Sequence, residues 1–377
     1  MPGASGGRIV ISYNTCWYIW NFRMPLIAAL RQRGYEVVAL APRDEYTRRI
    51  VSAGVTYRSI HIDPRGTNPV RELAALLAFI RIYRRLKPVA VLQYTIKPNL
   101  YGSIAARVLG ISAVNNVTGL GAAFESTGPF RGVIEALYRF AFRRVEQIFF
   151  QNPDDLRLFV QRRLVAPRHA ALLPGSGVDL AHFSPRPRGA GGFTFLFIGR
   201  LLKAKGVEEL VAAAHIVRAR LPGTRIVLLG KRDDDDPRSA DPRILDAAAS
   251  VGTIELAGTV DDVRPSIAAA DCVVLPSYYR EGIPRSLLEA AAMGRPLIAA
   301  DSIGTREPVR NGANGYHCRP RDHRDLADKM VAMAELSEGA RIAMGTASRR
   351  IAEDRFDERI VIAKYLQTID RLVGKAR

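Results

Sequence analysis

The chain is short of cysteine, tryptophan and acidic residues. Its 377 residues include 3 cysteines, 2 tryptophans and 37 Asp/Glu against 55 Lys/Arg. The cysteines, Cys16, Cys272 and Cys318, lie far apart, and none is part of a Cys-x-x-Cys pair. This spacing argues against a disulfide framework and against a cysteine metal site, and it favours a reducing compartment.

Long apolar runs are also missing. No segment approaches the roughly 20 apolar residues that a membrane-spanning helix needs. No secretory signal is evident, because Met1–Gly7 is small and polar and leads directly into a strand-like segment. We therefore expect a cytoplasmic protein, associated peripherally with the inner face of the cytoplasmic membrane if it binds lipid.

The shortage of acidic residues leaves a net charge of +18 that is unevenly spread. Residues 1–185 hold 24 Lys/Arg against 11 Asp/Glu, or +13, and the remainder holds 31 against 26, or +5. Basic residues mix with apolar ones in 78–87 and 130–144, a pattern that suits anionic lipid headgroups. An ordinary amphipathic helix with a solvated basic face is the alternative. No nucleic-acid motif is present and the charge is spread over several elements, so we expect no nucleic acid as partner.

Strand-like and helical segments alternate along the chain. Strands are expected at Arg8–Tyr13, Glu36–Ala41, Ala90–Tyr94, Ala113–Val117, Gln147–Gln151, Ala170–Leu173, Phe193–Ile198, Arg225–Leu229, Thr253–Leu256, Cys272–Leu275 and Pro296–Ala299. Helical patterns such as Pro25–Arg33 and Val70–Arg85 separate them. This alternation predicts an α/β protein with two doubly wound, Rossmann-like parallel sheets. The aperiodic stretch Ser184–Gly192, rich in proline and glycine, places the expected boundary between domains 1–188 and 189–356.

The most informative segment is Glu281-Gly-Ile-Pro-Arg-Ser-Leu-Leu-Glu289. It follows the apolar run Cys272–Leu275, and its periodicity predicts a helix whose first turn contains Pro284. One carboxylate then lies in the loop at the carboxyl end of a strand, and the other about one turn into the helix. Ligands bind at that place in a doubly wound sheet. For this pair alone, however, two solvated glutamates on a surface helix would be the default interpretation.

A second segment, upstream of the first, changes that interpretation. The strand-like run Phe193–Ile198 ends at Gly199-Arg200, and Lys205-Gly206 precedes a helical pattern that begins at Val207. Free backbone N–H groups and the helix dipole favour an anion at such a turn. With a guanidinium and an ammonium added, the turn becomes a candidate site for a diphosphate.

Together, Gly199-Arg200…Lys205-Gly206 and Glu281-x7-Glu289 resemble the donor-site signature of retaining GT-B glycosyltransferases of family 4. The resemblance runs from about residue 8 to the C-terminus. In the N-terminal half, four segments are similar to enzymes that extend undecaprenyl-diphosphate-linked sugars, including N-acetylgalactosaminyltransferases of glycan and O-antigen assembly. These segments are Phe22–Pro25, Asp44–Thr47, Thr95–Asn99 and Val117–Gly121.

The resemblance implies a GT-B fold with a cleft between an acceptor-binding, membrane-facing N-terminal domain and a donor-binding C-terminal domain. A helical region of about 357–377 would return to the first domain. The implied reaction is retaining hexosyl transfer, expected to move an N-acetylhexosamine from UDP to a polyprenyl-diphosphate-linked sugar in bacterial surface polysaccharide synthesis. An anionic membrane surface is the expected partner, mainly because the resemblance implies a lipid-linked acceptor. The exact sugar, nucleotide and linkage stay open.

The resemblance also implies roles for particular residues. Glu289 would bond the ribose hydroxyls, Glu281 would bond the donor sugar, and Arg200 and Lys205 would neutralise the diphosphate. Among these, Glu281, Arg200 and Lys205 are the expected catalytic residues. The other donor-side residues are expected to be Gly199, Gly230, Gly282, Ile283 and Pro284.

On the acceptor side, Asn14, Lys97, Thr118 and Gly119 each follow an expected strand. Lys97 is either a ligand for an acceptor phosphate or an ordinary surface lysine. The aromatic residues of Asn14–Asn21, expected to be a loop, either line an acceptor pocket or brace the cleft wall. Many family members carry a histidine where Thr118 falls, so the identity of any acceptor base stays open.

Four consecutive aspartates, Asp233–Asp236, form an acidic cluster that is a candidate metal site. Lys231 and Arg232 offset part of this charge, so we expect a solvated loop, no catalytic metal and no cofactor beyond the sugar nucleotide. Two other function classes remain open. A UDP-N-acetylhexosamine 2-epimerase-like enzyme would need the same fold and donor but no acceptor, and a non-catalytic basic binding protein would need no donor signature.

Overall fold

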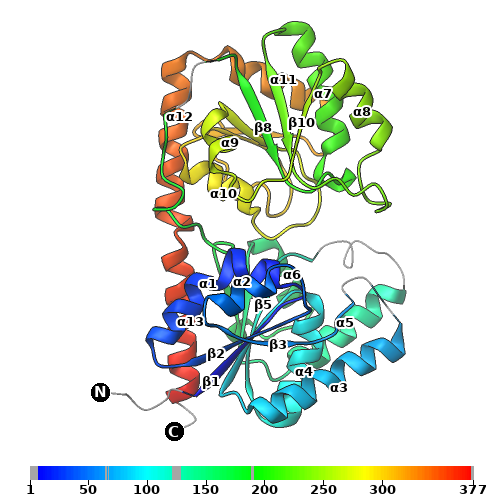
Figure 1. The fold of residues 1–377 in the computed structure, drawn as a ribbon, viewed down its shortest axis with the longest axis vertical. Helices are drawn as coiled ribbons and strands as arrows, with labels where there is room; N and C mark the ends of the chain where they lie inside the picture. Colours follow the sequence, from blue (N-terminus) through cyan, green and yellow to red (C-terminus); the bar gives the residue numbers. More distant parts are fainter. Residues whose placement is uncertain (1–6, 64–65, 67, 121–128, 188–190, 375–377) are drawn as a thin grey trace. The chain divides into compact units, whose positions relative to one another are not determined.

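The chain forms two units. The computed structural model describes residues 7–63, 66, 68–120, 129–187 and 191–374. Unit 1 comprises Met1–Leu173 and Arg359–Arg377, and unit 2 comprises Pro174–Glu358. In Figure 1, unit 1 runs from blue to cyan-green and includes the red C-terminal helix, whereas unit 2 runs from green to orange.

The expected domain boundary at 188/189 lies at residues outside the described ranges. The chain enters unit 2 at Pro174. Val178 and Phe183 are buried in the apolar core of unit 2, and the Val178 amide donates to the Phe356 carbonyl at 2.8 Å. Residues 174–187 therefore group with unit 2 because of packing, although the composition of the chain changes later.

Unit 1 is built on a parallel sheet with the strand order β3-β2-β1-β4-β5-β6-β7. Its strands are β1 (Arg8–Ser12), β2 (Glu36–Ala41), β3 (Thr56–Ser59), β4 (Ala90–Tyr94), β5 (Ser112–Val117), β6 (Gln147–Phe150) and β7 (Ala170–Leu172). The order reverses between β1 and β4, so the carboxyl ends of these two strands mark the ligand-binding edge of a doubly wound sheet.

Helices cover both faces of this sheet. They are α1 (Cys16–Gln32), α2 (Thr47–Ser52), α3 (Pro69–Leu86), η1 (Pro98–Gly102), α4 (Ser103–Leu109), α5 (Pro129–Phe142), α6 (Pro153–Gln161), η3 (Pro167–His169) and α13 (Glu358–Gly374). Alternate residues of β1 face opposite cores. Val10 packs in the core that includes Phe79 of α3, and Ile9 packs in the core that includes Tyr365 of α13. This is the period-2 alternation of a sheet buried on both faces.

Helix α1 begins well before the expected range Pro25–Arg33, so most of the loop expected at Asn14–Asn21 is helical. The Thr15 hydroxyl caps the helix by accepting from the Tyr18 amide at 3.4 Å. A second cap comes from Asp44, whose carboxylate accepts from the Cys16 amide at 2.7 Å. These caps satisfy amides that a helix leaves without internal partners.

Unit 2 repeats the plan with the strand order β10-β9-β8-β11-β12-β13. Its strands are β8 (Thr194–Ile198), β9 (Arg225–Leu229), β10 (Glu255–Gly258), β11 (Cys272–Leu275), β12 (Leu297–Ala300) and β13 (Gly315–Cys318). Its helices are η4 (Lys203–Lys205), α7 (Val207–Arg220), α8 (Pro242–Ser250), α9 (Arg264–Ala269), α10 (Arg285–Ala292), α11 (His323–Glu335), α12 (Glu338–Ile351) and η5 (Ala352–Phe356).

The predicted α/β class with two parallel sheets is confirmed. Two strands were not predicted, β3 and β13, and both lie at a sheet edge. An edge strand has one neighbour and partly exposed side chains, so its sequence lacks the continuous apolar run of a central strand. Within the described residues, no helix has the length and hydropathy to cross a membrane.

Candidate functional site

The two signature segments start side by side in unit 2. Strands β8 and β11 are neighbours, with Phe195 paired to Cys272, and the strand order reverses between them. The turns that follow their carboxyl ends are joined directly, because the amides of Tyr278 and Tyr279 donate to the Ala204 carbonyl at 3.0 and 2.9 Å. The structure therefore brings both motifs to the ligand-binding edge.

The turn after β8 requires glycine at position 206. The φ of Gly206 is +74°, and a Cβ there would lie 2.3 Å from the Pro276 carbonyl oxygen. A side chain would meet both the backbone strain and this close approach. Glycine thus permits the turn after β8 to lie directly against the segment after β11.

Lys205 and Glu281 meet at this edge. The Lys205 Nζ lies 3.0 Å from Oε2 of Glu281, and the two side chains are only 15% and 14% exposed. The other carboxylate oxygen, Oε1, accepts from the Ser277 hydroxyl at 2.8 Å. Ser277 was not predicted from the sequence. Its position two residues after the end of β11, the strand that precedes Glu281, is the signal that points to it.

The backbone around Glu281 is held by the segment that follows β12. A Cβ on Gly304, whose φ is +81°, would lie 1.7 Å from the Gly282 carbonyl oxygen. The Thr305 hydroxyl donates to the Ser277 carbonyl at 3.4 Å. Gly282, Ile283 and Pro284 are buried in this arrangement. A third loop from a neighbouring strand thus fixes the carboxylate-bearing loop.

Glu289 lies on α10 and is paired with Arg285. The Arg285 Nε donates to Oε1 of Glu289 at 2.9 Å, with the side chains 15% and 13% exposed. Burial raises the pKa of Glu289, and the Arg285 guanidinium opposes that rise. Sequence reasoning missed Arg285, although its i, i+4 spacing to Glu289 is the spacing at which helical side chains meet.

Arg200 does not join the two carboxylates. Its side chain is exposed, and among the described residues no hydrogen bond or ion pair engages its guanidinium. The adjacent Gly199 donates its amide to the Leu229 carbonyl at 2.9 Å. A Cβ on Gly230 would lie 1.7 Å from the Gly199 carbonyl oxygen. These two glycines let β8 and β9 end in close contact, with Arg200 projecting from that edge.

The residues predicted for the acceptor share one edge of the sheet of unit 1. Asn14 follows β1, Lys97 follows β4, and Thr118 and Gly119 follow β5, and these strands are neighbours. Within the described ranges, no hydrogen bond joins any two of the four. The Asn14 Oδ1 atom is buried and accepts no hydrogen bond there. Gly121, at the end of the Val117–Gly121 motif, lies outside the described residues.

Lys97 is neither an ordinary surface lysine nor an unpaired cation. It forms an ion pair with Glu72 of α3, and the side chains are 14% and 16% exposed. Its Nζ also donates to the Gly66 carbonyl at 2.8 Å. The lysine therefore ties the loop after β4 to α3, an arrangement that sequence reasoning did not include among its alternatives.

A buried arginine underlies the same edge. Arg23 is 2% exposed, and its guanidinium carbon lies 4.3 Å from the centre of the Tyr94 ring. The Tyr13 and Tyr94 rings are stacked, with centroids 4.7 Å apart, so aromatic faces surround the cation. Sequence reasoning noted the Phe22–Pro25 motif but assigned this arginine no role.

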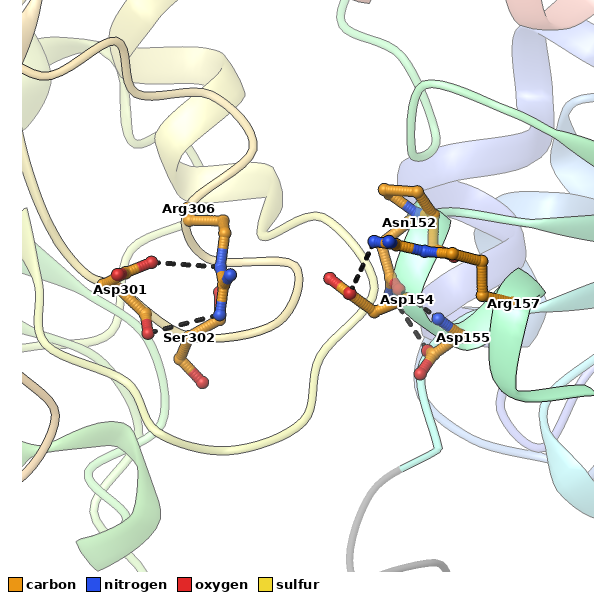
Figure 2. A network of polar contacts seen from close by, with 8 residues as sticks. Asn152, Asp154, Asp155, Arg157, Asp301, Ser302 and Arg306 are labelled. Atoms are coloured by element: carbon orange, nitrogen blue, oxygen red, sulfur yellow. Dashed lines mark hydrogen bonds and ion pairs between the residues drawn. The ribbon is translucent and has the colours of Figure 1, made fainter. Parts of the chain in front are cut away.

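Two of the four aspartates of 233–236 form ion pairs with arginines. Arg232 Nε lies 2.6 Å from Asp234, and Arg238 lies 2.6 Å from Asp236. Further aspartates are held in the same way, as Figure 2 shows for Asp301 with Arg306 in unit 2 and Asp154 with Arg157 in unit 1. In the part of the chain that the structure describes, no group of His, Cys, Asp or Glu side chains has the arrangement of a metal site.

Both halves of the chain match known domain families. Residues 12–152 match the family described as glycosyl transferase 4-like, and residues 192–335 match the family of glycosyl transferases group 1. The second match contains the whole signature of Arg200, Lys205, Glu281 and Glu289.

Full-length relatives point the same way. Over 94% of its length, the chain is 27% identical to the N,N'-diacetylbacillosaminyl-diphospho-undecaprenol alpha-1,3-N-acetylgalactosaminyltransferase of Campylobacter jejuni, of which it covers 96%. Over 83% of its length, it is 23% identical to the UDP-Gal:alpha-D-GlcNAc-diphosphoundecaprenol alpha-1,3-galactosyltransferase of Escherichia coli, of which it covers 86%. The resemblance inferred from the motifs is confirmed by these matches.

Solved structures confirm the fold. A glycosyltransferase from Rickettsia africae superposes with a TM-score of 0.80 at 14% identity, covering 97% of this chain and 98% of that one. Anabaena HepE, solved in complex with UDP and glucose, gives 0.79 at 16% identity and covers 97% and 99%. At these identities the likeness concerns architecture alone.

Proposed function

We propose that this glycosyltransferase transfers a sugar from a nucleotide diphosphate to a polyprenyl-diphosphate-linked sugar. Its N-terminal half matches the glycosyl transferase 4-like family, and its C-terminal half matches the glycosyl transferases group 1 family. The donor is UDP-linked and the sugar an N-acetylhexosamine, and the product belongs to bacterial surface glycan synthesis. The observation that carries this proposal is the meeting of Lys205 with Glu281 at the edge where β8 and β11 end.

The donor half of the reaction builds up negative charge on the departing diphosphate. Breaking the bond between the anomeric carbon and the diphosphate leaves the electron pair, and negative charge, on the departing phosphate. Lys205 and Arg200 would stabilise that charge, and a single such donor contributes about 3 kcal/mol to the transition state. Arg200 projects from the same strand end without an engaged guanidinium in the described residues, so it is available for a phosphate.

The donor sugar and the ribose would be held by the two carboxylates. Glu281, already fixed by Ser277, would accept hydrogen bonds from sugar hydroxyls, and Glu289 would accept them from the ribose. The backbone of Gly199, Gly230 and Gly282–Pro284 would line the nucleotide, since glycine permits the close approach of backbone to ligand.

The transfer step retains the anomeric configuration. The acceptor hydroxyl attacks the anomeric carbon from the face that the leaving group vacates. A new bond forms between the anomeric carbon and the acceptor oxygen as the bond between the anomeric carbon and the diphosphate oxygen breaks. The hydroxyl proton passes to an oxygen of the departing diphosphate. This route needs no protein base, which agrees with the absence of a histidine at Thr118, and it needs no metal ion.

Unit 1 offers a surface for a lipid-linked acceptor. Helices α3, α4 and α5 carry exposed large apolar side chains, which are Val70, Leu73, Leu77, Val108, Val133 and Phe140. Exposed arginines accompany them on α3 and just after α5, which are Arg81, Arg84, Arg85, Arg143 and Arg144. Arg107 of α4 places its guanidinium 4.8 Å from the centre of the Phe140 ring. Helix α4 packs against both α3 and α5. Exposed apolar and cationic side chains on neighbouring helices suit an anionic membrane.

The proposed reaction is tested by combining the purified protein with UDP-N-acetylhexosamines and membrane extract containing polyprenyl-diphosphate-linked sugars. Released UDP and the extended lipid-linked product are measured together, with Glu281→Gln as the inactive control. We expect stoichiometric UDP and product, with the new linkage in the donor's anomeric configuration. Conversion of the donor in the absence of acceptor would instead identify an epimerase, and release of neither UDP nor product with any donor would overturn the proposal.

The membrane surface is tested separately by flotation with vesicles of anionic or neutral phospholipid. We expect binding to anionic vesicles that weakens as salt is raised. Phe140→Ser should weaken it, whereas the control change Ile342→Ser, at an apolar residue of α12 in unit 2 that is even more exposed, should not. Equal binding by both variants would remove this surface from the proposal.

A further inference from the structure

The chain passes between the units at two places, Leu173/Pro174 and Glu358/Arg359. On the unit 2 side, these two passages are bonded to each other. The Val178 amide donates to the Phe356 carbonyl at 2.8 Å, and the Glu358 amide donates to the Val178 carbonyl at 3.1 Å. A Cβ on Gly177 would lie 2.4 Å from the Glu358 Cα atom. We call Pro174–Val178 together with Phe356–Glu358 the paired crossing.

Arg285 connects the paired crossing to Glu289. Its Nη1 donates to the Gly177 carbonyl at 2.7 Å and to the Ser176 hydroxyl at 3.4 Å. Its Nε donates to Glu289 at 2.9 Å. Because the guanidinium is a rigid plane, the orientation that satisfies Glu289 also determines where the Gly177 carbonyl is held.

The charge of Arg285 faces the crossing as well as Glu289. Burial raises the pKa of Glu358, with the neighbouring Asp179 adding to the rise, and the Arg285 guanidinium opposes it. Arg285 therefore stands between carboxylates of α10 and of the crossing. A lysine would preserve this charge but would lack the planar fork that makes both hydrogen bonds in fixed geometry.

We propose that Arg285 is a positioning residue that couples sugar-nucleotide binding at Glu289 to the paired crossing. The inference rests on the proposed function, in which Glu289 accepts hydrogen bonds from the ribose. A ligand that orders the Glu289 carboxylate also orders the guanidinium bonded to it, and hence the Gly177 carbonyl. By linkage, anything that loosens the crossing weakens nucleotide binding by the same factor.

The test uses hydrogen–deuterium exchange of the full chain with and without UDP. The amides of Val178 and Glu358 report on the crossing, because both are hydrogen-bonded within it. In the wild type, UDP should slow their exchange by about 5-fold or more, the lower range of measured couplings. Arg285→Lys should lose this UDP-dependent slowing. Ser176→Ala, which removes only the longer contact, is the matched control and should keep it.

Steady-state kinetics give an independent readout. Arg285→Lys should raise the KM of the donor and leave the KM of the acceptor unchanged, whereas a merely destabilised protein would lose active enzyme at unchanged KM. Thermal unfolding of each variant establishes that it is folded under the assay conditions.

The outcomes are distinguishable. UDP binding, seen by calorimetry, without a change in exchange at the crossing overturns the coupling and leaves the donor assignment standing. Full UDP-dependent slowing in Arg285→Lys overturns it as well. No heat of UDP binding by the wild type overturns the proposed donor, and the coupling falls with it.

Discussion

The Lys205 Nζ atom lies 3.0 Å from Oε2 of Glu281, although 76 residues separate them along the chain. Two neighbouring parallel strands, β8 and β11, bring these residues together by ending at the same sheet edge. Both side chains are largely buried, so each charge is poorly hydrated and depends on the opposite charge for its stabilisation. A sugar diphosphate that binds here must share this ion pair, so its two members are expected to act as a unit.

That relationship is tested by a double-mutant cycle with Lys205→Met and Glu281→Gln. Each single change should lower turnover by a factor of about 10² to 10³, because each removes a group directed at the reacting sugar or its leaving group. In the free energy of unfolding, the two changes should show a coupling of about 0.5 to 3 kcal/mol, as contacting residues do. Additive effects in urea unfolding would contradict the ion pair.

Arg200→Ala should lower turnover by a similar factor without lowering stability. The side chain is exposed and supports no other group in the described residues. Lys203→Ala is the matched control, since Lys203 is an exposed cation of the same turn. Thermal unfolding and initial rates measured on both variants decide the matter. Normal turnover in Arg200→Ala would remove this residue from the diphosphate site.

The donor kcat/KM should have an acid limb governed by Glu289. Burial raises the pKa of this carboxyl above its ordinary 4.5, Arg285 opposes the rise, and Asp262 adds to it. Asp262 itself is paired with Arg264 at 2.8 Å. Because the charged carboxylate accepts the ribose hydrogen bonds, kcat/KM should fall as pH falls through this raised pKa.

Arg285→Gln should move that limb to higher pH, because it removes the group that holds the pKa of Glu289 down. The sign for stability is opposite to that for activity. With a raised folded-state pKa, protonation of Glu289 favours the folded state, so its contribution is present below pH 4.5 and is lost as pH rises through the folded value. A pH–rate profile that is the same in both proteins would exclude Glu289 as the titrating group.

Lys97→Met should destabilise unit 1 by about 3 kcal/mol, since it leaves the largely buried Glu72 carboxylate without its cationic partner. The double variant Lys97→Met/Glu72→Gln should recover most of that loss. We expect its KM for the lipid-linked acceptor to equal that of the wild type. A KM for the acceptor above the wild-type value in the double variant, with stability restored, would show that Lys97 contacts the acceptor phosphate.

Arg23→Met and Arg23→Ala should have different effects on the free energy of unfolding. Methionine removes the desolvation penalty of a fully buried guanidinium and keeps most of its volume, so stability should stay equal or rise. Alanine opens a cavity beneath Tyr13 and Tyr94 and should cost about 3 kcal/mol. Chemical denaturation measures both. Equal large losses would show that the cation itself stabilises the edge.

The fold could be predicted because central parallel strands are buried on both faces. Runs such as Phe193–Ile198 and Cys272–Leu275 are apolar for that reason and stand out in the sequence. The edge strands β3 and β13 carry no such signal. The start of α1 was missed because one of its caps, Asp44, comes from a loop after another strand.

Some residues of the candidate site could also be predicted from local sequence, and others could not. Lys205, Glu281 and Glu289 could be named from local patterns, since a turn after a strand and the start of a helix are short-range features. Their partners could not. Arg285 shares a helix with Glu289, but its hydrogen bond to Gly177 spans 108 residues, and the pairing of Lys97 with Glu72 joins different elements.

The sequence by itself determined the class of fold, the two strand-to-turn motifs and their order along the chain. All three follow from local periodicity and from backbone requirements such as the glycine at 206. Only the tertiary structure decided which charges are neutralised and which remain available for a ligand. Pairing of side chains depends on which strands become neighbours, and that arrangement is set by packing across the whole of each unit.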